Sequence, residues 1–95
     1  MAANKSIVAV FNVPGMTAQQ YDKTIKELEA AGQGKPKGRL YHVAAAKPGG
    51  WFVLDVWASA EELNQFAQTL MPILQKAGVT PPQPEILPVH NIIKG

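Results

Sequence analysis

A turn sequence, Lys47-Pro48-Gly49-Gly50, separates two runs of residues, 39–46 and 51–57, that have the apolar character of β-strands. Proline followed by glycine favours a tight turn, so the two runs are predicted to pair as an antiparallel hairpin. A turn centred on Pro48 and Gly49 fixes the register of the whole hairpin. In that register His42 lies directly opposite Asp55.

Alternation of side chains along a strand sorts the hairpin into two faces. The first is almost entirely apolar and carries Arg39, Tyr41, Val43, Ala45, Phe52, Leu54 and Val56. The second holds the His42–Asp55 pair together with Leu40, Ala44, Ala46, Trp51, Val53 and Trp57. An ionisable pair flanked by two tryptophans is typical of a small pocket for an organic ligand.

Helix-capping patterns occur on both sides of the hairpin. Thr17 and Gln20 have capping-box spacing and predict a helix over 17–31. Ser59 and Glu62 repeat the pattern and predict a second helix that continues to about residue 77. Each helix carries an apolar stripe that can pack against a sheet.

Two prolines modify the elements that follow the hairpin. Pro72 lies inside the second helix and is expected to kink or break it near Met71. Pro88 lies inside a final strand-like run, 85–93, which is therefore predicted to be an edge strand. The first run, 5–13, is continuously apolar, which favours a strand in the middle of the sheet.

The resulting order, strand-helix-strand-strand-helix-strand, predicts a single α+β domain over 1–95 with the ferredoxin-like fold, a four-stranded antiparallel sheet with both helices on one face. We expect the helices to cover the Phe52, Leu54 and Val56 face. The face with Trp51 and Trp57 would then be an exposed apolar patch, so a second copy is expected to cover it sheet to sheet and form a homodimer.

This order of elements, the segment GGWFVLDVW (49–57) leading into the Ser59-capped helix, and the closing Pro88–Asn91 together resemble the dimeric α/β-barrel superfamily, which includes antibiotic-biosynthesis-monooxygenase-like domains. The resemblance implies a homodimeric, monooxygenase-like enzyme that needs no cofactor. Its small organic substrate would bind in a cavity between sheet and helices or between subunits. A non-catalytic ligand-binding or interaction dimer is the alternative.

Within either interpretation, His42 and Asp55 are the candidate catalytic residues, because a carboxylate bound to one imidazole nitrogen leaves the other nitrogen available as a base. The same two residues could also be a purely structural cross-strand pair. Trp51, Trp57 and His90 are candidates for shaping the ligand pocket, although the tryptophans could instead anchor the dimer. A two-histidine, one-carboxylate iron site made by His42, His90 and Asp55 is a minor alternative, and no metal is predicted.

Several classes of function are disfavoured by composition. The chain has no cysteine, which excludes disulfides, thiolate catalysis and cysteine-ligated zinc or iron–sulfur sites. The RNA-recognition motif shares the element order, but Asp55 stands where its third strand needs an aromatic residue, and the net charge is only +2. We expect no nucleic-acid or membrane partner. The absence of an apolar leader-like run near the start favours the cytoplasm.

Overall fold

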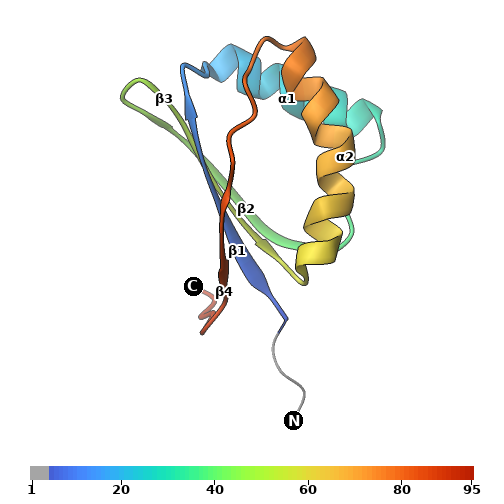
Figure 1. The fold of residues 1–95 in the computed structure, drawn as a ribbon, viewed down its shortest axis with the longest axis vertical. Coiled ribbons are helices and arrows are strands. Elements are labelled where there is room, and N and C mark those ends of the chain that lie inside the picture. Colours follow the sequence, from blue (N-terminus) through green and yellow to red (C-terminus); the bar gives the residue numbers. More distant parts are fainter. Residues whose placement is uncertain (1–4) are drawn as a thin grey trace.

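The computed structural model describes residues 5–95, and within this range two helices pack on one side of a four-stranded sheet (Figure 1). The elements are β1 (Ile7–Pro14), α1 (Ala18–Ala30), β2 (Arg39–Lys47), β3 (Gly50–Trp57), α2 (Ala60–Lys76) and β4 (Glu85–Pro88). The strands lie in the order β2-β3-β1-β4, and each neighbouring pair is antiparallel. The predicted ferredoxin-like fold is confirmed. Residues 1–4, on which part of the expectation about a leader depends, lie outside the described residues.

The predicted register of the hairpin is confirmed from Tyr41 to the turn, with His42 opposite Asp55. It then shifts by one residue, because Tyr41 pairs with Val56 whereas Arg39 pairs with Trp57. The extra residue, Leu40, makes this a β-bulge. Because of the bulge, Arg39 lies on the face of His42 and Trp57 and not on the face that strict alternation predicts.

The helices begin where the caps indicated. The Thr17 side chain accepts a hydrogen bond from the backbone N–H of Gln20 at 3.1 Å, and the Gln20 side chain accepts one from the backbone N–H of Thr17 at 3.0 Å. Ser59 caps α2 with its side chain alone, accepting from the backbone N–H of Glu62 at 3.2 Å. Neither helix within residues 5–95 combines the length and the apolar character that are needed to cross a membrane.

Two predictions about proline need correction. Of the kink or break predicted at Pro72, the break is wrong: α2 continues as one helix to Lys76, so packing of its apolar side against the core outweighs the lost backbone hydrogen bond. β4 ends at Pro88, well before residue 93, and within the described residues only the N–H of Val89 beyond it donates to the neighbouring segment, to Ser6 O at 3.0 Å. The edge position of β4 is as predicted.

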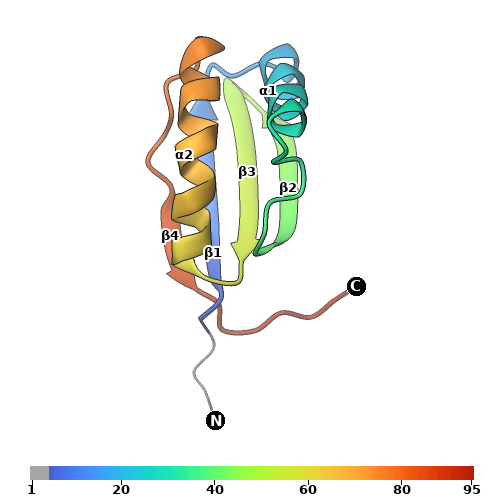
Figure 2. The same ribbon diagram turned by 90° about the vertical axis from the view of Figure 1, so that its right-hand side faces the viewer.

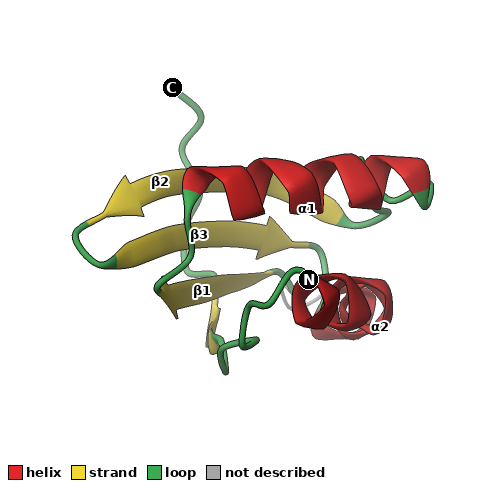
Figure 3. Cartoon of the chain, turned by 90° about the horizontal axis from the view of Figure 1, so that it is seen from above, coloured by secondary structure: helices red, strands yellow, loops and turns green. Residues whose placement is uncertain are grey.

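The assignment of the two sheet faces was wrong. The helices cover the face that carries His42, Asp55 and Trp57, and leave open the face that carries Val43 and Leu54. Figures 2 and 3 agree that α1 lies over the β2 side of the sheet and α2 over the β1 side, with β3 between them. Side-chain alternation shows which residues share a face, but it does not show which face the helices cover.

The core lies between the covered face and the helices. Its largest fully buried side chain is Trp57, whose ring centroid lies 5.2 Å from that of Phe66 on α2. The strands supply Ile7, Ala9, Phe11, Val13 and Trp57, and the helices supply Leu28, Leu63, Phe66 and Leu74. The remaining space toward the β2 side is the cavity described next.

Candidate functional site

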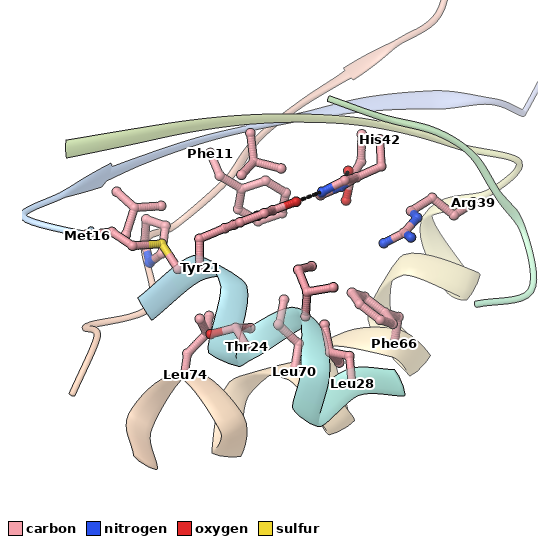
Figure 4. A pocket seen from close by; sticks show the side chains of 15 residues that line it. Phe11, Met16, Tyr21, Thr24, Leu28, Arg39, His42, Phe66, Leu70 and Leu74 are labelled. Carbon is pink, nitrogen blue, oxygen red and sulfur yellow. Dashed lines mark hydrogen bonds and ion pairs between the residues drawn. The ribbon is translucent and has the colours of Figure 1, made fainter. Parts of the chain in front are cut away.

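A cavity of about 70 Å³ lies between the sheet and the two helices (Figure 4). Its volume is below the roughly 300–1,000 Å³ of most ligand pockets, so in this form it suits a small molecule. The lining is mainly apolar and consists of Phe11, Val13, Met16, Ile25, Leu28, Val53, Phe66, Leu70, Leu74 and Pro82. The polar side chains in the lining are Tyr21, Thr24, Arg39, His42 and Asp55.

His42 and Asp55 form the hydrogen-bonded pair that the sequence predicted. The Nδ1 atom of His42 lies 2.6 Å from Oδ1 of Asp55, and the Asp55 side chain is only 5% exposed. The second carboxylate oxygen, Oδ2, accepts a hydrogen bond from the indole N–H of Trp57 at 3.3 Å. Since a carboxylate accepts hydrogen bonds, it holds the proton of a neutral imidazole on Nδ1 and leaves Nε2 as an acceptor.

Tyr21 on α1 completes a chain of three side chains. Its hydroxyl oxygen lies 2.6 Å from Nε2 of His42. The two ring planes differ by only 8° and their centroids are 6.1 Å apart, as expected for a hydrogen bond made in the plane of the imidazole. Trp51 packs against the tyrosine ring at a centroid distance of 5.3 Å and helps to hold it in place.

Burial raises the pKa of Tyr21 above its ordinary value of 10.0. The positive charge of Arg39 opposes this effect, and the negative charges of Asp55 and Asp22 add to it. Tyr21 is therefore a neutral hydroxyl at physiological pH, and its O–H donates to Nε2 of His42. In sequence, Tyr21 lies on the apolar stripe of its helix, which indicates only a core position; the signal that could have identified it is that a buried tyrosine hydroxyl usually has a polar partner.

The raised pKa of Tyr21 gives a pH dependence that can be measured. The chain has two tyrosines, and an alkaline titration followed by tyrosinate absorbance should contain a step above pH 10 that Tyr21→Phe abolishes and Tyr41→Phe retains. The contribution of the neutral Tyr21 hydroxyl to folding stability is fully present below the pKa that Tyr21 has in the unfolded chain. It is lost as the pH rises through the higher pKa of Tyr21 in the folded protein. Persistence of this step in Tyr21→Phe would contradict the assignment.

The other predicted pocket residues lie outside the cavity lining. Trp57 is fully buried in the core, so it is neither a surface for stacking a substrate nor a dimer anchor. Trp51 is half-buried against Tyr21, and its indole N–H is buried without a hydrogen-bond partner. His90 is exposed in the segment after β4. Within residues 5–95 no group of three His, Cys, Asp or Glu side chains could hold a metal ion, so the iron site considered from the sequence is not assembled.

No family model matches the sequence, and no curated protein matches it. Solved structures do match over nearly the whole chain. SnoaB, a cofactor-independent oxygenase from Streptomyces nogalater, superposes with a TM-score of 0.67 at 10% identity, covering 96% of this chain and 99% of its own. A candidate antibiotic biosynthesis monooxygenase from Chloroflexus aurantiacus gives 0.66 at 11% identity, with 94% and 97% covered.

A third similar structure is a Nitrosomonas europaea protein of unknown function, with a TM-score of 0.65 at 14% identity and 98% of each chain covered. At such identities, these similarities establish the shared fold and leave the chemistry open. The resemblance drawn from the sequence is confirmed at that level: the fold is that of the antibiotic-biosynthesis-monooxygenase-like proteins.

Proposed function

We propose that this protein is a monooxygenase-like enzyme that removes a proton from a small organic substrate bound between the sheet and the helices. The observation that supports this most directly is the continuous chain from the Tyr21 hydroxyl through His42 to Asp55 at one side of a mainly apolar cavity. A base in apolar surroundings can act on a phenol or an activated C–H without competition from bulk water.

The three side chains have distinct roles in this proposal. His42 is the base, and Asp55 fixes its orientation and stabilises the imidazolium that forms when it takes a proton. The Tyr21 hydroxyl passes its own proton to Nε2 of His42 as it receives one from the substrate. The distance of 2.6 Å from the Tyr21 hydroxyl to Nε2 permits the transfer to His42 without movement of the ring, and the bond of 2.6 Å from Nδ1 to Asp55 keeps the ring in this orientation.

Deprotonation supports the oxygenase assignment because a phenolate or enolate is the electron-rich form that can reduce dioxygen. The structural similarity to a cofactor-independent oxygenase favours the same reaction class. The test is to incubate the purified protein with a panel of small phenols and enolisable ketones, and to measure oxygen uptake and incorporation of oxygen into the product. Binding of these compounds without turnover of any of them would support the non-catalytic alternative.

The open face of the sheet supports a second proposal, that the protein works as a homodimer. Tyr41, Val43 and Leu87 lie on this face with exposed fractions of 37%, 54% and 46%, next to half-buried Leu54. Monomers rarely leave a contiguous apolar patch of this kind in water. A second copy packed face to face by a twofold axis would cover both patches at once.

A charge placed on the open face, on the edge strand β2, should disrupt this dimer. We expect Val43→Asp to convert dimer to monomer in analytical ultracentrifugation, because the dimer would have to bury an unpaired carboxylate. Gln19→Asp, which introduces the same charge on an exposed position of α1, is the matched control and should remain dimeric. A wild-type protein that is monomeric at all concentrations would rule the homodimer out.

A further inference from the structure

Arg39 brings a positive charge to the cavity that the proposed proton transfer does not use. Figure 4 shows its guanidinium reaching into the cavity from the start of β2, above Phe66. One Nη2–H donates to the backbone carbonyl of Gly34 at 3.2 Å, and Cζ lies 5.8 Å from the centroid of the Phe66 ring. Among residues 5–95, no carboxylate lies within ion-pair distance of Arg39.

Asp55 is the only acidic residue that lines the cavity in the described part of the chain, and it is already engaged. His42 binds one of its carboxylate oxygens and Trp57 binds the other. A guanidinium carries five N–H donors and stays protonated throughout the physiological range. Among residues 5–95 the protein gives Arg39 one hydrogen-bond acceptor, the carbonyl of Gly34, and no carboxylate partner.

The position of Arg39 depends on a specific backbone feature. If Leu40 paired as a regular strand residue and formed no bulge, strict alternation would place Arg39 on the open face with Tyr41. β-Bulges are frequent beside active sites, where they redirect a side chain. Two other basic residues, Lys35 and Lys37, lie just before Arg39 in the loop between α1 and β2. Both are exposed, so Arg39 alone of these three side chains points into the cavity.

We infer that Arg39 binds an anionic group of the ligand, and that this ligand is a small organic carboxylate with an apolar body. The planar fork of a guanidinium matches a carboxylate through two parallel hydrogen bonds. The apolar lining accommodates a hydrocarbon or aromatic body, and the volume of about 70 Å³ limits its size. The inference rests on the proposed function only in placing the reacting end of the ligand against Tyr21.

Binding of two acids and their uncharged amides tests this inference. Acetate, benzoate, acetamide and benzamide are titrated into the purified full-length protein, and dissociation constants are measured by NMR. We expect the acids to bind saturably and more tightly than their amides. Arg39→Gln should weaken acid binding about 10- to 100-fold, since a hydrogen bond to a charged group is lost.

Two further variants separate charge from geometry. Arg39→Lys keeps the charge but loses the fork, so acid binding should be intermediate. Lys37→Gln removes the same charge from an exposed neighbour and should bind the acids as the wild type does. Circular dichroism establishes that each variant is folded. Failure of both acids to bind, equal affinity for acid and amide, or unchanged affinity in Arg39→Gln would overturn the inference.

His42→Gln distinguishes failure of this inference from failure of the proposed function. If no substrate is turned over by the wild type, yet acid binding is retained in His42→Gln and lost in Arg39→Gln, the anion site stands and the catalytic proposal falls. If turnover depends on His42 but neither turnover nor acid binding depends on Arg39, the catalytic proposal stands and the anion site falls.

Discussion

Replacing Trp57 with alanine is expected to lower the free energy of unfolding by about 3–5 kcal/mol. A domain of 95 residues has roughly 5–14 kcal/mol in total, so the loss is a large share of its stability. The large effect arises because the side chain is fully buried, packs against Phe66 and donates to Asp55. Chemical denaturation followed by circular dichroism measures it.

Two variants identify the source of that loss. Trp57→Phe keeps most of the buried ring but leaves Oδ2 of Asp55 without its indole donor, which should cost about 1–3 kcal/mol. Trp51→Ala, on the same strand but half-buried, should cost less than Trp57→Ala. An equal loss in Trp51→Ala and Trp57→Ala would contradict the central position of Trp57 in the core.

Replacing His42 with glutamine is expected to lower kcat/KM by about 10²- to 10⁴-fold once a substrate is identified, which is the usual contribution of a general base. Glutamine is chosen over alanine because its amide can still donate to Asp55. It cannot take up a proton, so the chain from Tyr21 to Asp55 is interrupted while the shape of the site is kept. Steady-state kinetics together with the unfolding free energy provide the measurement.

The chain contains a matched control for this prediction. His90 is its only other histidine and is exposed, so His90→Gln should leave kcat/KM unchanged. Asp55→Asn should lower kcat with little effect on KM, because it removes the charge that stabilises the imidazolium. If His42→Gln lost stability but not activity, the pair would be structural and the catalytic proposal would be wrong.

The features that were predicted correctly from sequence are local ones. The turn at Pro48 and Gly49 fixed the pairing of His42 with Asp55, and the caps at Thr17 and Ser59 fixed where the helices begin. Each of these depends on residues that are neighbours in sequence or across a short turn. Their geometry is therefore set by backbone chemistry that can be read without the tertiary structure.

The features that escaped prediction depend on packing between distant segments. Tyr21 meets His42 only because α1 crosses the covered face, and which face that is cannot be read from alternation. Arg39 turns inward only because of the bulge at Leu40, which regular alternation of side chains does not predict. Pro72 was overestimated as a helix breaker because the tertiary contacts of α2 were not yet known.

The hairpin turn has a further consequence for how this sequence can change. Alternate residues of β3 face the cavity and the open face, so a slip of one residue would exchange the two sets. The turn is tied to the end of β1: Gly49 O accepts from Gly15 N at 2.8 Å, and a Cβ on Gly50 would lie 2.5 Å from Val13 O. Hairpin tips usually tolerate insertions. Here the tip determines which residues of β3 face the cavity and which lie on the open face. An insertion at the tip is therefore expected to alter both surfaces at once.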